Sequence, residues 1–395
     1  MKILDEQEQL AEDRASVPAD SPDISVFLPV YNEEPNLLPL HAKLDEALKK
    51  LGRTAEIVYV DDGSSDDTPA VAEALAARHP ETVHVLHVPN GGPGVARESG
   101  RRRARGEFIQ YLDSDDVLLP GKFEVQVEAL RRDPDCGVSY GKTRYVDEAG
   151  RGADTAWRRT GERIERMFPS FLAGRWWGTS TPLYRRSVTD AVGPWTSLWN
   201  EEDWEYDCRA AALGRRLAYV PDFVSEQRGH AADRLSRDGS SDPGKLRDRA
   251  AAHALILGHA ESAGIGPRAE EMRRFARELF LLSRQCGAAG LEHEARHLHG
   301  LARRASRGDR RRLDLRVYGV LARALGWRRM GQLACARDRR RAPARPRGHA
   351  GRGRRCPRPS GRPARRSDRR CPSTDGSARP CSRCRRAGRT TRRGG

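Results

Sequence analysis

The sequence predicts an α/β fold with a mainly parallel sheet flanked by helices, followed by a helical region. Three apolar runs that suit buried strands, in 24–32, 56–68 and 108–116, each end in acidic or polar residues. Between them lie segments whose apolar residues recur at helical spacing. Alternating strands and helices predict parallel strands joined by right-handed crossovers, so we expect the strand ends to share one edge of the sheet.

The first strand is expected in 24–32, ISVFLPVYN, an apolar run broken by Pro29 and followed by Asn32-Glu33-Glu34. A helix should follow, because apolar residues recur three and four positions apart at Leu37, Leu40, Leu44, Ala47, Leu48 and Leu51. The second strand, in 57–60, ends in Asp61-Asp62-Gly63-Ser64. A second helix fits 67–78, and a further strand fits 83–88.

The stretch FIQYLDSDD at 108–116 carries the strongest chemical signal. A four-residue apolar pattern runs directly into Asp113, Asp115 and Asp116. Ligands bind at the carboxyl edge of open α/β sheets, and clustered carboxylates there suit Mg²⁺ or Mn²⁺ carrying a phosphate. Asp-Ser-Asp-Asp is also a good turn or helix N-cap, so this stretch alone leaves both alternatives open.

Five segments together resemble the family-2 glycosyltransferases, which have the GT-A fold. They are PVYNEE (29–34), VDDGSSDDT (60–68), NGGPGVARESG (90–100), RGEFIQYLDSDD (105–116) and NEEDWEYDCR (200–209). The resemblance covers residues 23–235 and implies sugar transfer from a nucleotide-sugar, first of all a UDP-sugar, to a saccharide or lipid-linked acceptor. It further implies a divalent metal and inversion, in cell-surface glycan biosynthesis. The alternatives are a catalytically inactive module that binds nucleotide-sugar or glycan, and a basic-tail interaction protein.

On the donor side, the resemblance implies a role for each of five residues. Pro29 and Tyr31 would line the nucleotide base, Glu33 would lie near the ribose, and Asp62 would accept a hydrogen bond from a base N–H. Arg97 would approach the diphosphate. A helix-capping turn is the alternative for Asp62 and its neighbour Asp61, and a solvated helix arginine is the alternative for Arg97.

One position departs from the family pattern, and one charge run has a plainer explanation. Glu98 stands where the family commonly has Asn, which puts any role of position 98 in doubt. The run Arg101-Arg102-Arg103 is expected to be a solvated face.

For the metal, Mn²⁺ or Mg²⁺, the resemblance makes Asp115 a direct ligand and places Asp113 against the ribose or a metal-bound water. A further ligand of the family is often a histidine in a later loop. His230, in Arg228-Gly229-His230 after the strand-like 217–224, is the candidate here. A lone loop histidine is otherwise a surface group.

For catalysis, the resemblance makes Asp203 the general base and Glu202 its neighbour. A helix is expected over 201–213, and its dipole by itself favours acids in the first turn, which is the plainer explanation. Acceptor contacts are expected from at least one of Trp176, Trp177 and Trp199, because an exposed indole can stack on a sugar ring. Packing in the core is the alternative for each.

The charge balance divides the chain. Residues 1–300 carry 40 Lys and Arg against 50 Asp and Glu, whereas 301–395 carry 32 Arg, no Lys and five Asp. The basic character therefore belongs to the last quarter and does not indicate a specific nucleic-acid partner. We expect four parts: a polar extension (1–22), the GT-A domain (23–235), a helical region (236–335) and a disordered tail (336–395).

The helical region and the tail each leave two alternatives. The apolar stripe from Leu313 to Trp327 is flanked by arginines, so it could lie on an anionic membrane or form a packed helix-hairpin face, and the packed face is preferred. The tail lacks large apolar residues and is either a frameshift product or a true basic tail, which resequencing would decide. We find no signal peptide and no membrane span in the sequence, so a cytoplasmic protein, peripheral at most to the inner face of the plasma membrane, is expected.

Overall fold

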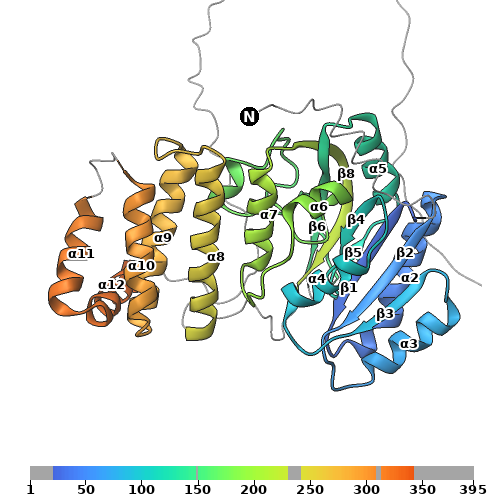
Figure 1. Cartoon of the computed structure of the whole chain (residues 1–395), viewed down its shortest axis with the longest axis horizontal. Helices are drawn as coiled ribbons and strands as arrows, with labels where there is room; N and C mark the ends of the chain where they lie inside the picture. Colours follow the sequence, from blue (N-terminus) through green and yellow to red (C-terminus); the bar gives the residue numbers. More distant parts are fainter. Residues whose placement is uncertain (1–20, 148–149, 230–241, 308–312, 342–395) are drawn as a thin grey trace, which may run out of the picture. The chain divides into compact units, whose positions relative to one another are not determined.

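The computed structural model describes residues 21–147, 150–229, 242–307 and 313–341 (Figure 1). One eight-stranded mixed sheet forms the centre, with the order β3-β2-β1-β4-β7-β6-β8-β5. The strands are β1 (Ile24–Val30), β2 (Ala55–Asp61), β3 (Val83–His87), β4 (Phe108–Tyr111), β5 (Val117–Leu118), β6 (Cys136–Val146), β7 (Leu183–Arg185) and β8 (Arg216–Arg228).

The first half of the sheet is parallel, as the sequence predicts. β1 pairs with β2 on one side and with β4 on the other, and β2 pairs with β3. In the second half, β7 is antiparallel to both of its neighbours, while β6 and β8 run parallel. The carboxyl ends of β1, β2 and β4 therefore open on one edge, which is the edge where the sequence places its acidic residues.

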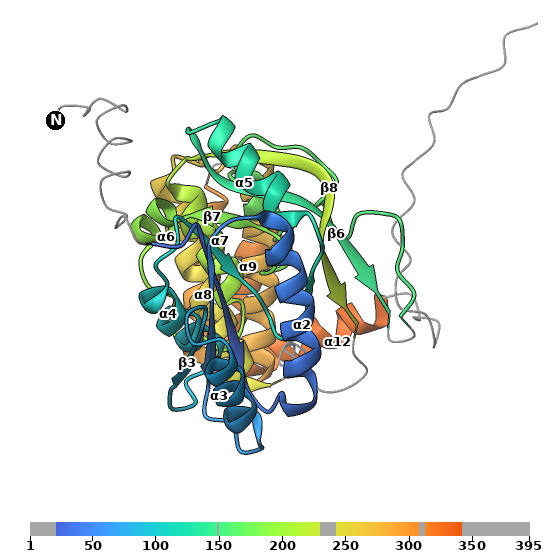
Figure 2. The same ribbon diagram turned by 90° about the vertical axis from the view of Figure 1, so that its right-hand side faces the viewer.

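Both faces of the parallel strands are covered, which explains why these strands are apolar along their whole length. Val26 and Leu28 pack on one face with the first helices, and Phe27 packs on the other face with α4. Figure 2 shows α2 and α4 on opposite sides of these strands. The helices of this part are α2 (Glu34–Leu51), α3 (Thr68–Arg78), α4 (Pro93–Arg103), α5 (Lys122–Arg132), α6 (Arg186–Val192) and α7 (Glu202–Ala212).

The helical region continues the core of the sheet. Its helices are α8 (Pro243–Ser262), α9 (Glu270–Ala288), α10 (Glu292–Ala305), α11 (Leu313–Leu325) and α12 (Trp327–Arg341). α7 lies between the sheet and α8 (Figure 1), and buried residues of α7 to α10 belong to the same apolar cluster as Phe27. α12 runs to Arg341, so the predicted boundary at 335 falls inside a helix. The other predicted boundary, at 235, lies outside the described residues.

The preferred prediction of a packed face for the stripe from Leu313 to Trp327 holds for one side of α11 only. Leu315, Tyr318 and Ala322 are buried, while the opposite side is exposed. No helix in the described ranges is long and apolar enough to cross a membrane.

Candidate active site

The carboxyl ends of β1 and β2 are fastened to each other by a small hydrogen-bond network. Val30 lies opposite Asp61 in the parallel ladder. Asn32, whose φ is 54°, donates its backbone N–H to Ser64 Oγ (2.9 Å) and accepts from the Ser65 N–H at its side-chain oxygen (2.8 Å). Asn tolerates this left-handed conformation better than most residues do, so Asn32 provides both the turn and the bonds to the loop after β2.

Glu33 extends this network to the third strand end. Its backbone N–H donates to Thr68 Oγ1 (2.8 Å), and its carboxylate accepts from Ser114 Oγ (2.7 Å). Ser114 lies within the acidic stretch after β4. Glu33 therefore joins the loops after β1, β2 and β4, and Tyr31 beside it is 50% exposed at the same edge.

The two aspartates after β2 have different partners. Asp61 stabilises its own turn by accepting from the Ser64 N–H and pairs with His87 Nδ1 at 3.1 Å, so its role is structural, although the N-cap residue of α3 is Asp67. Asp62 instead accepts from the backbone N–H groups of Gly91 and Gly92 (2.8 and 3.0 Å). Burial raises the pKa of Asp62, which these two bonds partly offset. Asp62 thus shapes the glycine segment before α4.

The residues after β4 form a compact acidic cluster. Asp113, Asp115 and Asp116 each bring one carboxylate oxygen within 4.8 Å of the others. Three hard oxygen donors at this spacing fit Mg²⁺ or Mn²⁺. Asp116 is nearly fully buried and accepts from Gln227 Nε2 (2.6 Å), so it is tied to β8.

The pairing of β5 with β8 bears on the histidine candidate. Val117, the residue after Asp116, lies opposite Glu226. The described end of β8 therefore lies beside the acidic cluster. His230 itself lies outside the described residues, and its role as a metal ligand stays a prediction.

Arg97 is the electrostatic centre of the site. Its guanidinium donates to Asp113 Oδ1 (2.8 Å) and to Glu202 Oε1 (2.7 Å), and it lies over the Trp195 ring. It is only 5% exposed, so the alternative of a solvated helix arginine is wrong. One planar cation therefore joins the acidic cluster after β4 to the acidic start of α7.

Charged residues that follow Arg97 on α4 form ion pairs with one another. Glu98 binds Arg101 and Arg102 and accepts from the backbone N–H of Trp195, which explains how a glutamate is accommodated at this position. Arg101 also pairs with Asp190, so the prediction of a solvated face is wrong for Arg101. Arg102 is exposed, as expected.

Three consecutive acids begin α7, and each has its own basic partner. Glu201 precedes the helix with a φ of 61° and pairs with Arg249 and His253 of α8. Glu202 pairs with Arg97. Asp203 pairs with Arg175 Nη1. A helix dipole alone would not require such partners, so the helical region and the loop before β7 both take part in holding this acidic turn.

The two central acids, Glu202 and Asp203, differ in protonation. Burial, together with the charge of Asp203, raises the pKa of Glu202 despite its bond to Arg97. Burial alone would also raise the pKa of Asp203, but Arg175 and Arg97 outweigh it and the pKa is lowered. Asp203 is therefore ionised at neutral pH, as a general base must be.

Arg175 is a site residue that sequence reasoning missed. It pairs with Asp203 and, through Nε, with Asp207 (2.6 Å), and Asp207 also accepts from Tyr184 Oη and Trp177 Nε1. Its only sequence signal was its place in FLAGRWWG, where the tryptophans draw attention. The link to Asp203 spans 28 residues and exists only in the folded chain.

Two of the three candidate acceptor tryptophans are core residues. Trp176 and Trp177 are 1% and 0% exposed and pack around Phe171, so they offer no free face to a sugar, and the alternative of core packing holds for these two candidates. Trp199 is 43% exposed, and a Cβ on Gly92 would meet its indole at 2.9 Å. It therefore lies against the glycine segment that Asp62 holds.

Comparison with known proteins bears on the family and on the fold. The model of glycosyl transferase family 2 matches residues 25–191, and this domain of the chain belongs to that family. The matched segment ends before α7, so the acidic turn lies beyond it.

The putative glycosyltransferase EpsH of Bacillus subtilis is 28% identical over 55% of this chain and 64% of its own length. An undecaprenyl-phosphate 4-deoxy-4-formamido-L-arabinose transferase of Pseudomonas paraeruginosa is 32% identical over 43% of this chain and 49% of its own. The matched part of the chain thus spans less than two thirds of these relatives.

Solved structures extend the likeness beyond this family match. Residues 1–349 of Staphylococcus aureus TarS, in complex with UDP-GlcNAc, align over 80% of this chain and 92% of theirs, with a TM-score of 0.58 and 19% identity. At this identity the likeness shows the fold alone. It confirms the predicted fold class, a GT-A α/β domain followed by C-terminal helices.

Proposed function

We propose that this chain transfers a sugar from a nucleotide-sugar, with a UDP-sugar first among donors, to a hydroxyl of a saccharide or lipid-linked acceptor in cell-surface glycan biosynthesis. The reaction would depend on a divalent metal and invert the anomeric carbon. One observation carries the proposal: Arg97 bridges the acidic cluster after β4 and the acidic turn of α7, so the two halves of a transfer site share one edge of the sheet.

The donor would lie over the joined loops of β1, β2 and β4. Tyr31 and Pro29 would face the base, Glu33 the ribose, and the Gly91–Gly92 segment held by Asp62 the phosphates. The TarS structures were solved in complex with UDP-GlcNAc and with UDP, which supports a uridine nucleotide. Because Glu33 and Asp62 are already fixed by bonds within the protein, little reordering would accompany donor binding.

The acidic cluster would hold the metal through Asp115, with Asp113 and His230 as the further candidates. A bound Mn²⁺ or Mg²⁺ would neutralise charge on the leaving diphosphate. Arg97, itself buried, would add a fixed positive charge beside Asp113.

Asp203 would act as the general base. The acceptor oxygen forms a bond to the anomeric carbon as the bond from that carbon to the diphosphate oxygen breaks, and the hydroxyl proton passes to the Asp203 carboxylate. Attack from the face opposite the diphosphate inverts the configuration. Arg175 keeps Asp203 ionised and fixes its orientation, and Trp199 is the remaining tryptophan candidate for the acceptor.

An inactive binding module is the second candidate, and one observation favours it. Asp203 is held by Arg175, and an aspartate kept in an ion pair is a weaker base. Such a module would bind nucleotide without turnover. The main proposal also includes a cytoplasmic location, because nucleotide-sugars are made in the cytoplasm.

Calorimetric titration of the whole chain with UDP, GDP and dTDP, with and without Mn²⁺, tests the donor site. We expect Mn²⁺-dependent binding of one nucleotide, at least tenfold weaker in Asp115→Ala. Asp190→Ala, at an exposed carboxylate beside Arg101, is the matched control. Binding by none of the three nucleotides would overturn the proposal, and binding without sugar transfer would leave the inactive module.

A further inference from the structure

α11 has two apolar sides, and only one of them is covered. Successive residues of a helix lie about 100° apart, which places Leu313, Val317 and Val320 opposite the buried Leu315, Tyr318 and Ala322. Leu313 and Val320 are 65% and 63% exposed. Together with three neighbours they form an exposed apolar ridge, which consists of Leu313, Val317, Val320, Leu321 and Leu325.

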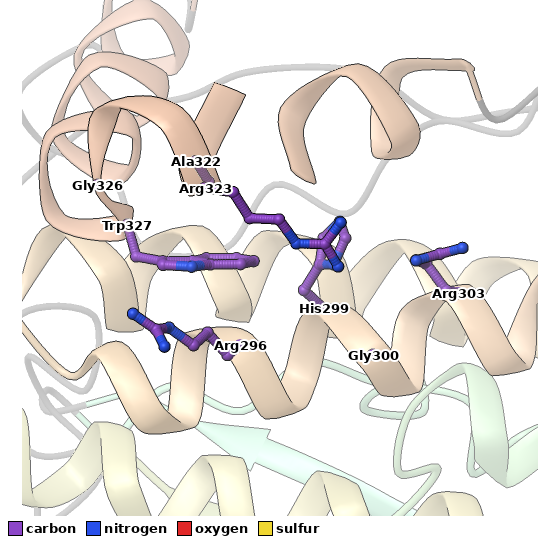
Figure 3. A pocket seen from close by; sticks show the side chains of 8 residues that line it. All are labelled: Arg296, His299, Gly300, Arg303, Ala322, Arg323, Gly326 and Trp327. Carbon is purple, nitrogen blue, oxygen red and sulfur yellow. The ribbon is translucent and has the colours of Figure 1, made fainter. Parts of the chain in front are cut away.

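Arginines border this ridge on one flank. Arg316 and Arg323 follow one another on the side of α11 between its exposed and buried faces. Beside Arg323, a cavity of about 370 Å³ lies between α10 and the start of α12. Figure 3 shows Arg296, Arg303 and Arg323 lining this cavity together with Trp327 and His299.

The cavity carries an excess of positive charge. Arg296 pairs with Glu292, but Arg303 and Arg323 have no ion pair with a carboxylate in the described part of the chain. Burial lowers the pKa of His299, and the nearby Arg303 and Arg323 lower it further, so this imidazole is neutral. Across residues 292–307 and 313–338 the sequence has nine arginines and four carboxylates.

We propose that the exposed apolar ridge and the arginine cavity beside it dock on an anionic lipid bilayer. α11 would lie in the plane of the interface with the ridge toward the acyl chains, and Arg303 and Arg323 would bind lipid phosphates. This inference concerns a different surface from the proposed transfer site and stands without it.

Other occupants fit this surface less well. A second copy, packed ridge to ridge about a twofold axis, would bring the flanking arginines of both copies together. Residues 342–395 contain no Ile, Leu, Val, Phe, Met, Trp or Tyr, so they lack the side chains that would cover an apolar ridge. A bilayer with anionic headgroups supplies both the apolar phase and the negative charge.

Flotation of the full chain with lipid vesicles tests the proposal. We expect binding to vesicles of equal parts phosphatidylcholine and phosphatidylglycerol, and weak binding to phosphatidylcholine alone. The double variant Val317→Asp with Val320→Asp should lower the affinity by about tenfold or more, because it removes apolar area and adds negative charge. Its matched control is Leu38→Asp with Leu255→Asp, two exposed apolar residues on α2 and α8.

The arginine cavity has its own pair of variants. Arg303→Glu with Arg323→Glu should weaken binding several-fold more than Arg268→Glu with Arg277→Glu, which changes the net charge equally at two exposed positions, one just before α9 and one in its middle. The basic residues 342–395 are unchanged in every variant, so binding through them alone would make each variant equal to its control and overturn the proposal. Failure of the wild type to float would overturn it as well, as would a dimer that the ridge variant dissociates.

Discussion

The edge of the sheet and the surface of α11 handle charge in opposite ways. At the edge, Glu201, Glu202 and Asp203 each pair with a basic side chain, and Asp62 and Asp116 accept hydrogen bonds from other segments. On α11, Arg323 has no carboxylate partner among the described residues, and Val320 is open to solvent. The charges of the first region are paired with other groups of the described chain, while the arginines and the apolar ridge of the second are not, which is the basis of the proposed docking surface.

Asp203→Asn should have the largest effect, and it tests whether the acidic residues at the start of α7 take part in sugar transfer. Loss of the proposed general base should reduce the rate of transfer by about 10²–10⁴-fold while nucleotide affinity stays unchanged. Initial rates and calorimetry on the same protein measure both. Asp190→Asn is the control at an exposed position. A parallel loss of nucleotide affinity would point to misfolding instead.

Arg97→Ala should lower the stability of the protein, because it removes the cation that joins the two acidic segments. Removing one cation leaves Glu202 buried without its partner, at a cost of about 3–5 kcal/mol in the free energy of unfolding. Arg97→Lys should recover only part of this, since an ammonium does not reproduce the planar fork that reaches two carboxylates. Urea unfolding measures the change, and Arg102→Ala on the exposed side of α4 is the control. Equal stability of the two alanine variants would contradict the bridging role.

Glu202→Gln should change how stability depends on pH. The pKa of Glu202 is raised from 4.5 to about 7, so the folded state holds this proton more tightly than the unfolded state. The resulting stability is present at acidic pH and lost as the pH rises toward 7. The free energy of unfolding of the wild type, relative to Glu202→Gln, should therefore fall across this window. A difference that is independent of pH would show that Glu202 has an ordinary pKa.

Two glycine substitutions give the smallest effects and should have opposite signs. A Cβ at Gly94 would come within 2.0 Å of the Thr196 carbonyl oxygen, so Gly94→Ala should destabilise the fold by about 1–3 kcal/mol. Gly258 lies exposed in α8 with nothing near its Cβ position, so Gly258→Ala should stabilise by about 1 kcal/mol. Thermal unfolding separates the two, and a stabilising Gly94→Ala would mean that the contact between α4 and the loop before α7 is loose.

Much of the fold follows from local patterns in the sequence. The strands at β1 to β4 and the helices between them lie where apolar runs and three- and four-residue spacing predict them. The acidic cluster could also be predicted from the sequence, because Asp113, Asp115 and Asp116 lie within four positions of one another. By contrast, the sequence could not decide which of Trp176, Trp177 and Trp199 is exposed, since a tryptophan has the same sequence signal in a core as on a surface.

The sequence by itself determined the alternation of strands and helices, the acidic strand ends and the division of charge along the chain. Tertiary structure alone decided that Arg97 binds both Asp113 and Glu202, the second of which lies 105 residues further along the chain than Arg97. The fold likewise decided that Arg175 pairs with Asp203. It also decided which side of α11 is covered. Hydrophobic period and turn chemistry act over a few residues, whereas burial and ion pairing depend on which distant segments packing brings together.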